Sequence, residues 1–178
     1  MRYLIGLIVF IFIYFIIYQK YLKGKRKIDK LKLTVMYIYL MLVAFVTILP
    51  IDFALDPKWK YHSSINFVYI HIKPFNGLIH GYSGALKEII LNIIMTMPFG
   101  FLYADIKNDV SIDQIMIKTF LLSFTIESIQ LIMTIFLLHY RSCDVTDLIT
   151  NVIGGVIGFI LYKLWKPHLN KWYEKFEK

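Results

Sequence analysis

Cysteine is almost absent from this chain, and so are the motifs of several common enzyme classes. Cys143 is the single cysteine among 178 residues, which excludes an internal disulfide framework and leaves helix packing as the source of stability. The sequence contains no glycine-rich nucleotide loop, no H-E-x-x-H metal motif and no legible Ser-His-Asp or Cys-His arrangement. Its pattern therefore indicates neither a nucleotide-dependent enzyme nor a familiar hydrolase.

Charged residues are also scarce, at 18% against 58% hydrophobic residues, and the mean hydropathy is +0.60. Several apolar runs approach the roughly 20 residues that cross about 30 Å of hydrocarbon. The formal net charge of +8 comes from basic residues at the ends of these runs, a pattern that fits anionic lipid headgroups better than a nucleic-acid groove. We expect a polytopic membrane protein that binds no nucleic acid.

Hydropathy predicts an all-α integral membrane protein, a bundle of about five transmembrane helices. A signal peptide is the alternative for the first run, but only Arg2 precedes it and no small-residue cleavage site follows. The stretch 51–84 is too polar to span and rich in aromatic residues, so we expect an extended or interfacial segment over the outer mouth of the bundle. The five predicted spans are 3–18, 33–49, 86–104, 115–138 and 148–165.

Basic residues predict the orientation. Residues 20–32 carry seven Lys or Arg against the single acid Asp29, which marks a cytoplasmic loop and places the N-terminus outside. The tail 163–178 is basic and aromatic, as expected of a cytoplasmic C-terminus with an interfacial turn. The inner loop with Asp105, Lys107, Asp109 and Asp113 is not positive, although acids count little in this rule. This N-out, C-in topology puts 14 of the 20 Lys and Arg residues inside and 6 outside.

Polar residues recur at helical spacing within three of the predicted spans. Such spacing places side chains on one helix face. Gly154 and Gly158 also form a small-xxx-small pair that allows a neighbouring helix to approach closely. The three polar stripes are Glu88, Asn92 and Thr96; Ser123, Glu127, Gln130 and Thr134; and Asp147, Asn151, Gly154 and Gly158.

Glu127 is the strongest candidate for a working residue. A charged side chain at the centre of a membrane helix costs roughly 2.5–3.5 kcal/mol on insertion scales. We expect Glu127 to act as a proton carrier, a general acid or base, or a partner of Arg141. The amides of Asn92, Gln130 and Asn151 either orient a substrate or simply hydrogen-bond between helices.

The loop 140–148 adds Arg141, Asp144 and Asp147 near the outer end of the bundle. Arg141 either pairs with one of these acids or meets a phosphate or carboxylate bidentately. Asp144 or Thr146 has the alternative role of capping the last helix. Oxygen ligands from Glu127, Asp144 and Asp147 would suit a hard cation, but no tight motif accompanies them, so no metal site is predicted.

Four segments together resemble the VanZ-like family, small bacterial membrane proteins named for a teicoplanin-resistance determinant. They are KPFN at 73–76, NIIMTMPFGFLY at 92–103, ESIQL at 127–131 and RSCDVTDLITNVIGGVIGF at 141–159. The sequence departs from the family pattern at Cys143. The positions that match the family signature are Asn92, Pro98, Gly100, Glu127, Gln130, Arg141, Asp144, Asp147, Asn151 and Gly154.

The resemblance implies a multi-pass protein of the bacterial plasma membrane that lowers susceptibility to lipoglycopeptides such as teicoplanin. It divides the chain into two N-terminal helices with the start of the outer segment (1–65), a VanZ-like membrane domain (66–162) and a basic cytoplasmic tail (163–178). The polar residues themselves suggest roles: Glu127, Asp147 and Arg141 are the catalytic candidates, and Asn92, Gln130, Asp144 and Asn151 are the substrate-binding candidates.

The sequence is compatible with three functions. The chain either shields an amphiphilic envelope component at the outer leaflet, acts as a transferase or hydrolase on a lipid-linked precursor, or uses its polar residues only to lock the bundle. The lipid bilayer is one expected partner, and a lipid-linked envelope precursor or the lipoglycopeptide itself is another. No cofactor and no oligomeric state is indicated.

Overall fold

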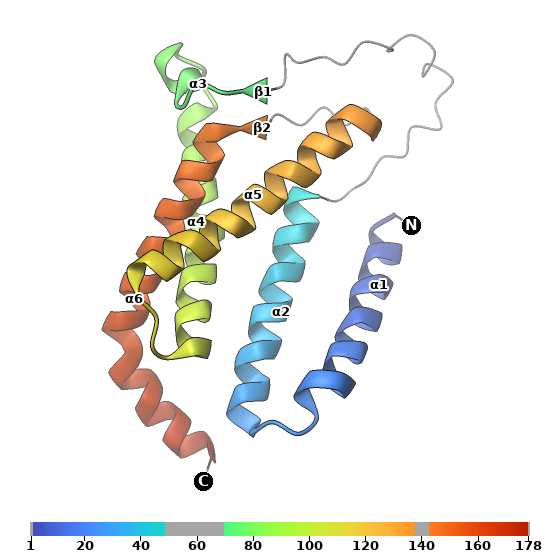
Figure 1. Cartoon of the computed structure of the whole chain (residues 1–178), viewed down its shortest axis with the longest axis vertical. Helices are drawn as coiled ribbons and strands as arrows, with labels where there is room; N and C mark the ends of the chain where they lie inside the picture. Colours follow the sequence, from blue (N-terminus) through green and yellow to red (C-terminus); the bar gives the residue numbers. More distant parts are fainter. Residues whose placement is uncertain (1, 49–69, 138–142, 178) are drawn as a thin grey trace.

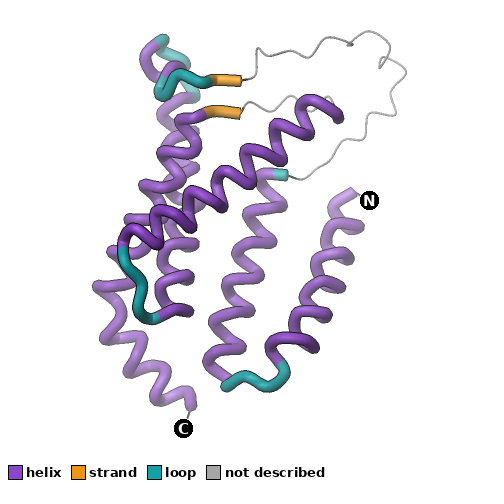
Figure 2. The backbone as a smooth tube through the Cα atoms, in the orientation of Figure 1, coloured by secondary structure: helices purple, strands orange, loops and turns teal. Residues whose placement is uncertain are grey.

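The structure is a computed structural model of the whole chain, and it describes residues 2–48, 70–137 and 143–177. Helices dominate it (Figures 1 and 2). The long helices are α1 (Arg2–Ile17), which continues as the π-helical turn η1 (Tyr18–Leu22), α2 (Lys27–Thr47), α4 (Ala85–Lys107), α5 (Ile112–Leu137) and α6 (Val145–Glu177). The short elements are β1 (Ile70–His71), α3 (Asn76–Ile79) and β2 (Cys143–Asp144).

Within these described ranges, four helices are long and apolar enough to cross a membrane: α2, α4, α5 and α6. The first predicted span, 3–18, corresponds to a shorter apolar helix over Gly6–Leu22. The all-helical membrane character is thus confirmed, while the count of five rests on α1. Many apolar side chains of α1 are exposed, which suits a helix that faces lipid.

Successive long helices run in alternating directions (Figure 1). The start of α4 and of α6 and the end of α2 lie at one end of the bundle, here named the cavity end. The turn 23–26, the turn 108–111 and the C-terminus lie toward the other, here named the basic end. α5 crosses α4 and α6 obliquely, and α1 lies outermost beside α2.

Glycines set the close packing of α4 against α6. A Cβ atom added to Gly100 would overlap the carbonyl of Gly155, and one added to Gly158 would overlap the carbonyl of Met97. Gly154 faces the carbonyl of Ile93 in the same way. The predicted packing role of Gly154 and Gly158 is therefore confirmed, because only residues without a side chain allow the two backbones to approach this closely.

The tail and the inner loop differ from their predicted form. Residues 163–177 continue α6 through Pro167, so the helix has 33 residues and a length of about 50 Å, more than the hydrocarbon core requires. Its last turns pack on α4, where the hydroxyl of Tyr173 donates to Asp105 Oδ2 at 2.6 Å. Asp105 itself lies inside α4 rather than in a loop, and only 5% of it is exposed.

A short cap covers the cavity end. β1 and β2 pair in parallel, with Ile70 opposite Cys143 and His71 opposite Asp144. Phe75 has a positive φ of 58°, and its backbone N–H donates to Thr146 Oγ1 at 2.9 Å, which ties the segment 70–79 to the start of α6. The predicted segment 51–84 is extended at Ile70–His71, and its residues up to 69 lie outside the described part.

Candidate functional site

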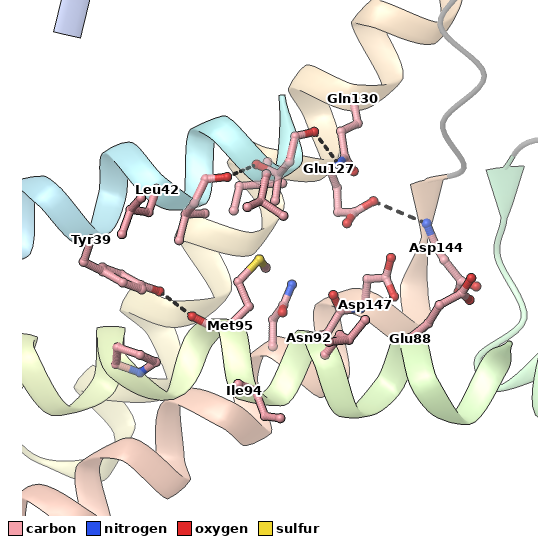
Figure 3. Close-up of a pocket in the computed structure, with 17 residues that line it drawn as sticks. Tyr39, Leu42, Glu88, Asn92, Ile94, Met95, Glu127, Gln130, Asp144 and Asp147 are labelled. Atoms are coloured by element: carbon pink, nitrogen blue, oxygen red, sulfur yellow. Dashed lines mark hydrogen bonds between the residues drawn. The ribbon is translucent and has the colours of Figure 1, made fainter. Parts of the chain in front are cut away.

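A cavity of about 720 Å³ opens between α2, α4, α5 and the first turns of α6 (Figure 3). Its volume lies in the range that holds drug-sized ligands. Its wall combines aliphatic side chains with carboxyl, amide and hydroxyl groups. The lining residues are Tyr39, Leu42, Val43, Val46, Thr47, Glu88, Leu91, Asn92, Ile94, Met95, Pro98, Ile126, Glu127, Gln130, Asp144, Asp147 and Asn151.

Four carboxyl groups converge on the cavity from three helices and β2. Glu127 is buried, with 5% of its surface exposed, and its Oε2 accepts a hydrogen bond from the backbone N–H of Asp144 at 3.3 Å. Asp147 accepts from the amide of Asn92 on the facing helix α4. Glu88 and Asp144 lie beside Asp147 at the same end of the cavity (Figure 3). None of these lining residues is Lys, Arg or His, so the described wall is acidic.

Asp144 also caps α6. Its Oδ1 accepts from the backbone N–H of Thr146 at 2.7 Å, which satisfies one of the helix's unpaired N-terminal donors. The predicted capping role is therefore confirmed. Because the same residue donates its own N–H to Glu127, it holds the start of α6 against α5.

The opposite wall is built by α2. Tyr39 donates its hydroxyl to the carbonyl of Met95 at 2.8 Å, and Gln130 Nε2 donates to the carbonyl of Thr47 at 3.0 Å. Met95 lies one turn before Pro98, which interrupts the helical ladder of α4 and disturbs the carbonyls before it. These two bonds hold α2 against α4 and α5.

Asn151 forms the floor with two buried neighbours. Its Nδ2 donates to Ser123 Oγ on α5 at 2.8 Å, and its backbone carbonyl accepts from Thr96 Oγ1 on α4 at 2.7 Å. Its exposed fraction is 1%, yet its Oδ1 has no hydrogen-bond partner among the residues that the structure describes. Within the described residues this amide oxygen is therefore a buried acceptor without a donor.

Six of the seven predicted site residues line this one cavity. They are Asn92, Glu127, Gln130, Asp144, Asp147 and Asn151. The seventh, Arg141, lies outside the described residues. Thr134 of the predicted α5 stripe lies in the helix, and its side chain is likewise not described. The catalytic and binding roles assigned to the set remain predictions.

The sequence reading missed Tyr39 and Thr47 as parts of the wall, because α2 shows only an apolar run. Glu88 was placed on the correct helix face but was not assigned to the site. Nothing in a single sequence indicates that the side chain of Tyr39 faces α4. Thr47 lies two residues before the end of the predicted span 33–49. Polar groups near the end of a span can reach water, so this position could have indicated a role for Thr47.

A metal centre finds no support in the described part of the chain, where no group of three His, Cys, Asp or Glu side chains is arranged to hold an ion. The chemistry that the wall offers is hydrogen bonding, proton transfer and the attraction of positive groups. Carboxylates accept from amines and hydroxyls, and Asn92 and Gln130 fix the walls around them.

Comparison with known proteins agrees with the four sequence motifs. The VanZ/LLP1 family model matches residues 36–166, from within α2 to within α6. The chain is 28% identical to the protein VanZ of Enterococcus faecium over 134 residues, which cover 75% of this chain and 74% of that protein. No solved structure matches. This protein belongs to the VanZ/LLP1 family.

Proposed function

We propose that this protein acts at the outer leaflet of a bacterial plasma membrane and lowers susceptibility to teicoplanin-type lipoglycopeptides. Its cavity would bind, shield or alter an amphiphilic envelope component, so that an acylated glycopeptide engages its target less well. The observation that carries the proposal is the convergence of Glu127, Asp147, Asn92 and Gln130 on one cavity in a chain similar to VanZ. An acyl chain partitions into lipid, so a membrane-embedded protein is a suitable antagonist.

The proposed orientation rests on the distribution of basic residues. Seven basic residues between 20 and 32 lie at the basic end, together with the basic C-terminal turns of α6. Because Lys and Arg favour cytoplasmic loops, the proposal places the basic end inside and the cavity end outside. The mouth of the cavity then lies in the outer half of the membrane, near the level where envelope precursors and the antibiotic are found.

Within the proposal the residues have separate tasks. Glu127 and Asp147 accept protons or positive groups, while Asn92, Gln130 and Asn151 orient the bound molecule. Arg141 would meet a phosphate or carboxylate. The retention of a buried Glu127 supports a task beyond packing, because burying a carboxyl group in a membrane helix is costly.

An intramembrane transferase or hydrolase acting on a lipid-linked envelope substrate is the second candidate. Two carboxyl groups, Glu127 and Asp147, lie in the same cavity, as acid and base catalysis requires. This candidate would be favoured over shielding by two results together. The wild type would form product from a lipid-linked precursor, and Glu127→Gln would form none.

The test is a comparison of teicoplanin and vancomycin inhibitory concentrations in a susceptible Gram-positive host. We expect the wild type to raise the teicoplanin value and to leave the vancomycin value nearly unchanged, because only the first drug carries an acyl chain. Glu127→Gln should remove the protection at equal membrane abundance, checked by immunoblot. A wild type without any effect on teicoplanin would contradict the proposal.

A further inference from the structure

An apolar groove continues from the polar cavity toward the middle of the bundle. Its volume is about 580 Å³, and Tyr39, Leu42 and Pro98 line both the cavity and the groove. The rest of its wall is apolar and comes from α2, α4 and α6. These further lining residues are Val35, Ile38, Met97, Phe101, Leu102 and Leu161.

The two hollows follow each other along the helices. On α2 the cavity extends from Thr47 to Tyr39, and the groove from Leu42 to Val35. Seven residues of helix correspond to about 10 Å, roughly a third of the hydrocarbon thickness. A molecule that fills both hollows therefore has a polar head at the cavity end and an apolar chain directed toward the bilayer centre.

The cavity also selects the chemistry of the head. Glu88, Asp144 and Asp147 gather on its wall, and none of the described residues that line it is basic. A head group that donates hydrogen bonds and carries positive charge complements these carboxylates better than a purely anionic head does.

We propose that the cavity and groove together bind a membrane lipid whose head group bears an amine, with one acyl chain seated between α2 and α4. This inference names the ligand class for the cavity on which the proposed function rests. The cavity has room for a lipid head group rather than for a whole glycopeptide, since about 720 Å³ corresponds to a drug-sized ligand. The ammonium group lies among Glu88, Asp144 and Asp147, and the chain follows Ile38 toward Val35.

The test uses the full-length protein in phosphatidylcholine nanodiscs with a trace of photoactivatable lipid. The two probes are a phosphatidylethanolamine with a diazirine on one acyl chain and the phosphatidylglycerol with the same chain. We expect about thirtyfold more labelling by the amine-headed probe, about threefold for each of the three carboxylates around the ammonium group. The labelled peptides should include the groove residues of α2 and α4.

Two variants test the head-group site and the acyl-chain site separately. Glu88→Gln, at an exposed position, should lower the ratio between the two probes by about threefold, the effect of one intramembrane hydrogen bond. Ile38→Trp fills the groove and should lower labelling by both probes. Ile160→Trp is its matched control, because Ile160 on α6 is 49% exposed, like Ile38 at 45%, and lines neither hollow.

Equal labelling by both probes, or equal labelling of Ile38→Trp and Ile160→Trp, would overturn the inference and indicate unspecific surrounding lipid. The antibiotic test gives a separate result. Selective labelling of a protein that gives no protection would overturn the proposed function and support the ligand assignment. Protection without selective labelling would overturn the ligand assignment alone.

Discussion

Asp105 at the basic end joins three helices and offers a quantitative test of the packing. Its Oδ1 lies 3.1 Å from Lys32 Nζ, and its Oδ2 accepts from the hydroxyl of Tyr173 at 2.6 Å. The two charged side chains are 10% and 7% exposed. The ion pair therefore connects α2 to α4, and the tyrosine connects α6 to both.

Asp105→Asn should lower the free energy of unfolding by about 3 kcal/mol, because it leaves the ammonium group of Lys32 buried without its counter-charge. This value is at the low end of the range measured for broken buried ion pairs. In the variant Lys32 Nζ still donates to the backbone carbonyl of residue 105 at 2.9 Å and lies 4.2 Å from the centre of the Tyr173 ring. Lys32→Met should cost about the same. The double variant should lose less than either single variant, because no unpaired charge then remains.

Unfolding of the purified protein by sodium dodecyl sulfate in mixed micelles measures these values. Asp109→Asn is the control, because Asp109 lies four residues further on and is exposed. If Asp105→Asn and Asp109→Asn differ by less than about 1 kcal/mol, or if the two single losses simply add, the ion pair does not hold the helices together as described.

Two further substitutions test the packing and the wall. Gly158→Ala should destabilise the protein by more than about 2 kcal/mol, because the added Cβ would overlap the carbonyl of Met97. Gly24→Ala is the control and should change the melting temperature little, because no atom lies within 4 Å of its Cβ. Equal effects of the two substitutions would contradict the close approach of α4 and α6. Tyr39→Phe removes the hydrogen bond to the carbonyl of Met95 and should cost about 1 kcal/mol, read from the same detergent unfolding curves; an unchanged midpoint would show that α2 is held by other contacts.

The sequence predicted the spans well because hydropathy reports a local property, the transfer of apolar side chains from water. The cavity followed from helical spacing, which put Glu127 with Gln130 and Asp147 with Asn151 on common faces. The pairing of helices did not follow, because Lys32 and Asp105 are 73 residues apart and nothing local links them. The length of α6 was underestimated for the same reason, since contacts such as Tyr173 with Asp105 stabilise helix beyond Pro167.

The resemblance to one family and the cavity support each other, but they rest on different observations. The motifs locate Asn92, Glu127 and Asp147 in the sequence, and the fold brings them to one cavity from three helices. Tyr39 completes that wall from α2, a helix for which hydropathy alone predicted no polar role. The match to the VanZ/LLP1 family model begins at residue 36 and therefore includes Tyr39.

The most direct measurement compares antibiotic protection with protein stability for cavity and packing variants in one host. Teicoplanin inhibitory concentration, membrane abundance and melting temperature would be determined for the wild type, Glu127→Gln, Asp147→Asn and Asp105→Asn. We predict that the two cavity variants lose protection at nearly normal abundance and melting temperature, whereas Asp105→Asn loses protection only in proportion to its abundance. Cavity variants that protect as well as the wild type would contradict the claim that the cavity is the working site.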